Sequence, residues 1–136
     1  MLKRALLAAV VATALFQSPA HAGLKDIYPL GVAWHSDGTI TFWGSLGSVR
    51  NSSNPVEELG CNTVHQPGGF TLGYCYAVHH SGQGTFEVSC TTYDPNMVAA
   101  FRSVGTDTFV HLTVDREGRC SNILIQNQSL LPPKAP

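Results

Sequence analysis

The sequence predicts a mainly β fold, a small antiparallel β-sandwich or partly open barrel with one short helix over about residues 95–104 and two disulfides. Three observations predict it. Apolar and polar side chains alternate along most of the chain, which is the period of a strand with one buried face. Turn-forming clusters of Gly, Pro, Asp and Ser separate these segments at short intervals. The four cysteines are enough for two bridges.

The segments 31–36 and 39–43 predict the first hairpin, because the two residues between them are Asp-Gly, a strong signal for a tight turn. Within this hairpin we expect Trp34 and Phe42 in the core. Trp43 falls on the opposite face from Phe42, beside threonines and a histidine. The hairpin should therefore have one apolar face and one more polar face.

The rest of the chain continues the β pattern with one clear interruption. Residues 44–54 are rich in Gly, Ser and Asn, and we expect a short strand or a loop there. The predicted helix follows from Asp94 as N-cap, Pro95 at the first helical position and Gly105 just beyond the end. Further strands are expected at 56–64, 70–79, 85–92, 108–114 and 120–126.

The first 22 residues predict a secretory signal peptide. Lys3 and Arg4 form a positive start, an apolar run follows over 5–16, and residues 20–22 have the small-x-small pattern of a cleavage site. The apolar run is shorter than the ~20 residues that a helix needs to cross a bilayer. We therefore expect export to the periplasm or the extracellular space, with residues 1–22 removed.

The remainder is predicted to form one β-rich domain at 23–131, followed by an extended Pro-rich tail at 132–136. Loss of Lys3 and Arg4 changes the net charge from −1 to −3. The remaining basic residues are scattered, so no basic stripe exists for a nucleic acid or an anionic membrane surface. Because no cysteine stands near the cleavage site and no later segment could span a bilayer, we expect no membrane anchor.

An even set of cysteines in an exported protein predicts two disulfides, and this set is Cys61, Cys75, Cys90 and Cys120. Sequence alone allows three connectivities. The intervening turns place Cys75 opposite either Cys61 or Cys90. The order of elements favours Cys61–Cys75 with Cys90–Cys120, since the helix returns the chain and the last strand then starts near the end at which Cys90 lies.

No motif for catalysis or metal binding stands out. The sequence has no G-x-S-x-G elbow, no free thiol is expected, and no pair of carboxylates is predicted to share a cleft. Histidines could hold zinc or copper only if the fold brought three of them together, because none has the HxH, HExxH or HxxxH spacing. These weak metal candidates are His35, His79 and His111. We expect no cofactor, and an enzyme is the less favoured class.

Aromatic side chains among polar neighbours are the better indication of function. Trp43 lies on the polar face of the first hairpin, Tyr74 and Tyr76 share one face of a strand, and Tyr93 precedes the helix. Exposed Trp and Tyr form binding surfaces for sugars and proteins. A two-sheet protein can equally bury such side chains in its core, and the sequence leaves both arrangements open.

One set of short motifs covers most of the chain beyond residue 22. It consists of SVRNS at 48–52, LGC at 59–61, GYCYA at 73–77, VSC at 88–90, GRC at 118–120 and PPKAP at 132–136. In these motifs the chain resembles a group of small exported bacterial proteins with four cysteines and no assigned activity. The resemblance implies a shared cysteine framework and implies no catalytic residue.

The sequence therefore predicts an exported, disulfide-stabilised binding or interaction module for a protein or a glycan. A small secreted hydrolase, or an inhibitor of one, is an alternative, and a structural envelope component is a third. A cleft that joins His35 or His111 to a carboxylate would favour the enzyme. A continuous exposed aromatic patch would favour the binding module, whereas full burial of Trp43 and the tyrosines would exclude it.

Overall fold

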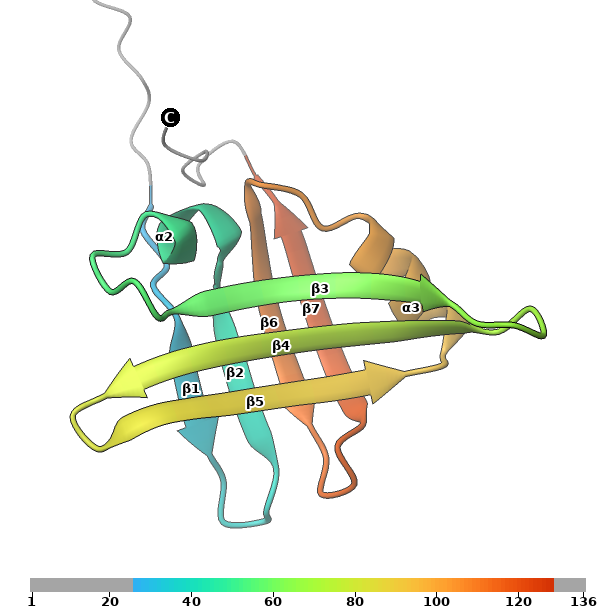
Figure 1. The fold of residues 1–136 in the computed structure, drawn as a ribbon, viewed down its shortest axis with the longest axis horizontal. Coiled ribbons are helices and arrows are strands. Elements are labelled where there is room, and N and C mark those ends of the chain that lie inside the picture. The colour runs from blue at the N-terminus through green and yellow to red at the C-terminus, as the bar shows by residue number, and fades with distance from the viewer. Residues whose placement is uncertain (1–25, 129–136) are drawn as a thin grey trace, which may run out of the picture.

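The computed structural model describes residues 26–128, so the predicted signal peptide and Pro-rich tail lie outside the described residues. Within that range, seven strands form two antiparallel sheets that cross each other face to face (Figure 1). The sheets stay open and do not close into a barrel. The predicted mainly β, two-sheet fold is confirmed.

Sheet A has four strands in the order β1-β2-β6-β7, and sheet B has three in the order β3-β4-β5. The strands of sheet A are β1 (Gly31–Trp34), β2 (Ile40–Ser45), β6 (Thr108–Val114) and β7 (Cys120–Asn127). Those of sheet B are β3 (Glu58–His65), β4 (Thr71–Ser81) and β5 (Gly84–Thr92). Each expected strand is present with ends within a few residues of its prediction.

The core lies between the two sheets, where the inward faces of both meet. Alternate residues of β2, β4, β5 and β6 supply it, as the period-2 pattern predicts. Its buried side chains from sheet A include Phe42, Val110, Leu112 and Val114, and those from sheet B include Cys75, Ala77, Val88 and Cys90.

Trp34 was expected in this core, and that prediction is wrong. Its side chain is 56 % exposed. It shares a face with Phe42, but it ends the short edge strand β1, so few elements reach it. Its ring meets Phe86 of β5 edge-on at 5.5 Å between ring centroids. The sequence therefore predicts correctly which face of the sheet Trp34 is on. How deeply the side chain is buried depends on where the strand ends.

In the part of the chain that the structure describes, two helices lie at opposite ends of β3 (Figure 1). The predicted helix is α3 (Pro95–Arg102), and Asp94 caps it by accepting hydrogen bonds from the backbone N–H groups of Asn96 and Met97. The second, α2 (Leu46–Arg50), replaces the strand or loop expected within 44–54. In the described part of the chain, no helix is long and apolar enough to cross a membrane.

Helix α2 forms because its first turn is capped and its inner face packs against the core. The hydroxyl oxygen of Ser45 accepts a hydrogen bond from the N–H of Ser48, and Val49 is buried against the core. A helix of five residues has no apolar repeat long enough to be recognised in a sequence. The expected strand or loop is thus corrected to a single capped helical turn.

The favoured cysteine pairing is confirmed. Cys61 and Cys75 lie directly opposite each other on β3 and β4, with 4.1 Å between their Cα atoms. Cys90 on β5 is bonded to Cys120 on β7, so this second bridge joins sheet B to sheet A. The N–H of Thr91 also donates to the carbonyl of Gly118 beside that bridge.

Candidate functional site

The predicted aromatic residues lie on three separate surfaces. Trp43 is on the outer face of sheet A, Tyr74 and Tyr76 are on the outer face of sheet B, and Tyr93 precedes α3. Tyr93 is 62 % exposed, and the other three are half-buried. None is in the core, but they do not form one continuous patch, because β2 and β4 belong to different sheets.

The outer face of sheet A has an aromatic row that contains Trp43, and Phe109 on the same face packs against Tyr28. Gly31, Trp43, His111 and Leu124 are in register across its four strands. The Trp43 indole lies over Gly31 and is nearly parallel to the His111 ring, with 6.2 Å between ring centroids. Leu124 beside them is 47 % exposed. This row is short, and it contains no Asp, Glu, Lys or Arg side chain.

The three candidate metal ligands do not meet. His35 donates to or accepts from the hydroxyl of Thr41 on sheet A, and His111 stacks on Trp43. His79 lies on the other sheet, in β4. Among residues 26–128, no group of three or more His, Cys, Asp or Glu side chains is placed to hold a metal ion.

The described chain has one close histidine–carboxylate pair, His79 with Glu57, at 3.5 Å between Nδ1 and Oε1. The other oxygen of Glu57 accepts a hydrogen bond from the hydroxyl of Ser52 at 2.8 Å. The carboxylate therefore stands between the serine and the histidine. A nucleophilic serine needs the histidine next to its hydroxyl, so this arrangement does not activate Ser52.

The outer face of sheet B carries the two stacked tyrosines. Tyr74 and Tyr76 are two residues apart on the central strand β4, so both point outward, and their rings are nearly parallel with 5.7 Å between centroids. Polar side chains of the flanking strands surround them. The rows across β3, β4 and β5 are Asn62–Tyr74–Thr91, Gly60–Tyr76–Ser89 and Glu58–Val78–Glu87.

Tyr76 leans over the neighbouring strand β3. A Cβ atom at Gly60 would come within 2.9 Å of the Tyr76 ring, so the glycine makes room for it. Burial, and after it the negative charge of Glu58, raises the pKa of the Tyr76 hydroxyl above its ordinary value of 10.0. The hydroxyl is therefore protonated at neutral pH, and the Glu58 carboxylate is its hydrogen-bond acceptor.

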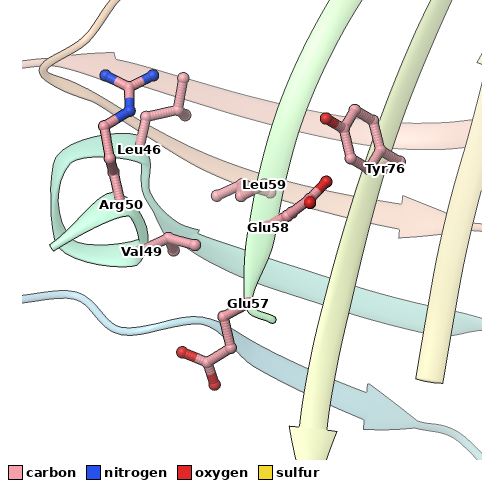
Figure 2. A pocket seen from close by; sticks show the side chains of 7 residues that line it. All are labelled: Leu46, Val49, Arg50, Glu57, Glu58, Leu59 and Tyr76. Atoms are coloured by element: carbon pink, nitrogen blue, oxygen red, sulfur yellow. The ribbon is translucent and has the colours of Figure 1, made fainter. Parts of the chain in front are cut away.

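A pocket of about 210 Å³ lies between α2 and β3 at the edge of this face. Leu46, Val49 and Leu59 form its apolar wall, and Arg50, Glu57, Glu58 and Tyr76 complete the lining. Figure 2 shows Arg50 and Glu58 on opposite sides of Leu59, with Glu58 next to Tyr76. Tyr76 thus belongs both to the stacked pair and to the pocket.

The sequence interpretation missed Arg50, Glu57 and Glu58 as members of a site. Arg50 comes to the pocket only because residues 46–50 fold as α2, which was not predicted. Glu58 comes to Tyr76 through the register of β3 on β4. The period-2 pattern did place Tyr74 and Tyr76 together, and that part of the interpretation agrees with the structure.

Comparisons with known proteins give no match. No protein-family model matches the chain, no curated protein matches it, and no solved structure matches it. Function is therefore inferred from the geometry of the faces and the pocket.

Proposed function

We propose that the protein is an exported, disulfide-stabilised binding module that holds a protein or a glycan on the outer face of sheet B. One observation carries this proposal. Tyr74 and Tyr76 stack on a face that no other described element covers; Figure 1 looks onto this face, and nothing lies in front of it.

Stacked tyrosines on a sheet suit binding for a physical reason. Each ring offers a large apolar surface with a polar tip, and it has few rotatable bonds to immobilise. Here β4 is held on both sides by β3 and β5, and the Cys61–Cys75 bridge ties β3 to β4 on the opposite face. Little conformational entropy remains to be lost when a partner docks.

Export is supported by the cysteines and by the predicted signal peptide. All four described cysteines are paired in disulfides, which persist in oxidising compartments. Together with the charged start and apolar run of residues 1–22, this supports a place in the periplasm or outside the cell.

Comparison of two surface variants tests the proposal. The exported protein is purified with both disulfides formed. Labelled protein is applied to a glycan array, and immobilised protein is used to capture envelope and medium proteins from its own cells. We expect an identified glycan or protein that wild type and Trp43→Ala both retain and that Tyr74→Ala/Tyr76→Ala loses. Retention by the double tyrosine variant with loss in Trp43→Ala would move the binding site to sheet A and overturn the proposal.

A further inference from the structure

We infer that the partner on sheet B is a protein, bound through a lysine or arginine side chain that lies between Glu58 and Glu87 beside Tyr76. This inference rests on the proposed function and names the chemistry of its ligand. A cationic side chain is the occupant because the face offers two carboxylates and two aromatic rings, and its three strands contain no lysine or arginine.

The two carboxylates flank the central strand. Glu58 of β3 and Glu87 of β5 both lie opposite Val78 of β4, in one row across the sheet. Strands are about 4.8 Å apart, so the two Cα atoms are about 10 Å apart. Both glutamates are exposed. Val78 has no polar atom in its side chain, so a cation above it would meet the carboxylates on its two sides.

The tyrosines occupy the next two rows along β4. Tyr76 is adjacent to the glutamate row, and Tyr74 lies beyond it. A lysine or arginine carries its charge at the end of an apolar stem, which packs on aromatic rings while the head group stays with the anions. Along β4 the carboxylates come first, then Tyr76 and then Tyr74. This order matches a side chain with its charge at one end and apolar surface along the rest.

No described lysine or arginine already fills this role. Strands β3, β4 and β5 contain no lysine or arginine. His80 is on the same outer face, in the row next to Val78 on the side away from Tyr76, and its Nδ1 is hydrogen-bonded to the Thr85 hydroxyl. Arg50 lies across the β3 edge, on the other side of Leu59 from Glu58 (Figure 2). In residues 26–128, neither Glu58 nor Glu87 forms a salt bridge; Glu58 accepts a hydrogen bond from Tyr76, which leaves its negative charge without a cation.

A neutral glycan would fit this face less well. Sugar hydroxyls stack and hydrogen-bond to tyrosines, but they give no compensation for two negative charges on the same row. A cation between the glutamates reduces their mutual repulsion. Charge complementarity therefore favours a basic protein segment, and the glycan becomes one outcome of the test.

The test is an NMR titration of the full exported protein, labelled with ¹⁵N, at neutral pH and low salt. The probes are a hexapeptide alternating glycine and lysine, the same peptide with its lysines acetylated, and chitotetraose. Acetylation removes the charge and keeps the stem. We expect the lysine peptide to shift the amide signals around Tyr76 and Val78, and the acetylated peptide to leave them in place.

Variants with matched loss of charge identify the contact. Glu58→Gln/Glu87→Gln should lower the affinity for the lysine peptide by about tenfold. Asp107→Asn/Glu117→Gln removes two charges elsewhere and should change that affinity by less than about twofold. Tyr76→Phe should retain binding, because the ring and not the hydroxyl meets the cation. Wild-type affinity should also fall as salt rises to about 0.3 M, which needs no variant.

Several results would overturn the inference, and they separate it from the proposed function. Equal binding of the acetylated peptide, or no effect of the two glutamine substitutions, would show that binding does not depend on a cationic side chain. If chitotetraose binds in a way that requires Tyr74 and Tyr76, and the lysine peptide gives no response, the ligand is a glycan and not a protein. The proposed binding module would then still hold. If a partner binds wild type and the Tyr74→Ala/Tyr76→Ala variant equally, the outer face of sheet B is not the binding site and the proposed function itself fails.

Discussion

At the residue scale, glycines make room for aromatic rings on both outer faces and in the core. A Cβ atom at Gly31 would overlap the Trp43 indole, and one at Gly60 would meet the Tyr76 ring at 2.9 Å. Gly73 has the same relation to Phe101 of α3, at 2.6 Å. A glycine weakens a strand by itself, and the covering ring restores the missing contacts.

Gly31→Ala tests this arrangement on sheet A. The added methyl group should displace the Trp43 indole toward solvent and cost about 1 kcal/mol, the lower end of overpacking because the ring is half-buried. In a Trp34→Phe background Trp43 is the sole tryptophan, so its emission should shift to the red. Gly82→Ala is the control, because nothing lies within 4 Å of its Cβ. Unchanged emission and urea midpoint in Gly31→Ala would contradict the prediction.

Asp115 makes the stability depend on pH below pH 4. The pKa of its carboxyl is held below the ordinary value of 3.8, first by the backbone N–H of Arg119 and then by the Arg119 side chain and the N–H of Glu117. Because the folded pKa is the lower one, the carboxylate stabilises the fold above about pH 4, and this contribution is lost as pH falls through the folded value.

Asp115→Asn should therefore lower the urea midpoint at pH 6 and have a progressively smaller effect as pH falls from 4 toward 2. Unfolding curves at pH 6, 4 and 2.5 would measure the difference. Asp107→Asn is the control, since no hydrogen bond to that carboxylate is present among the described residues. A deficit of constant size across this range would mean that Asp115 acts through its shape rather than its charge.

At the element scale, the sequence predicted those elements that carry their own signals. α3 has a cap, a proline at its first position and a buried stripe, and all are local. The strands have alternation and turns, including the tight turn at Gly38, whose φ of 83° favours glycine. α2 lacks a repeat and depends on Ser45 and on the core beneath Val49, so it could not be predicted.

The candidate site divides in the same way. Strand periodicity placed Tyr74 and Tyr76 on one face, and cysteine order helped place β3 beside β4. Which side chains flank the tyrosines depends on the register of three strands, and the sequence does not specify it. One residue of slip would turn Glu58 and Glu87 to the inner face. The pocket depends in addition on α2.

The cap of α3 provides a prediction at this scale. Asp94→Ala removes an acceptor for the N–H groups of Asn96 and Met97 and should lower the free energy of unfolding by about 1 kcal/mol. Asp94→Asn retains an acceptor oxygen and should lose much less. Urea unfolding followed by circular dichroism would measure both. Equal losses in the two variants would assign the effect to the charge of Asp94 rather than to its hydrogen bonds.

At the scale of the whole molecule, the two sheets have separate jobs. Their inner faces make one shared core, whereas their outer faces differ in character: sheet A has a Trp43–His111 row, and sheet B has the stacked tyrosines with two glutamates. The Cys90–Cys120 bridge is a covalent link between the sheets, and Cys61–Cys75 acts within sheet B alone.

This difference predicts unequal costs of removing the two bridges. The chain separation is 30 residues for Cys90–Cys120 and 14 for Cys61–Cys75. The chain-entropy model then assigns them about 3.6 and about 3 kcal/mol. Cys90→Ala/Cys120→Ala should cost more than this difference suggests, because both of its cysteines are buried and Cys61 is only half-buried.

Urea unfolding of the two double-alanine variants would measure these costs, with the wild type carrying both bridges as reference. A second readout separates stability from function. In native buffer, loss of Cys61–Cys75 allows β3 to shift relative to β4, the strand that carries the tyrosines, and should weaken the binding of any partner there. A folded Cys90→Ala/Cys120→Ala variant keeps the register of sheet B. If the inter-sheet variant lost binding while still folded, the partner would have to contact both sheets, and the binding surface would extend beyond the tyrosine face.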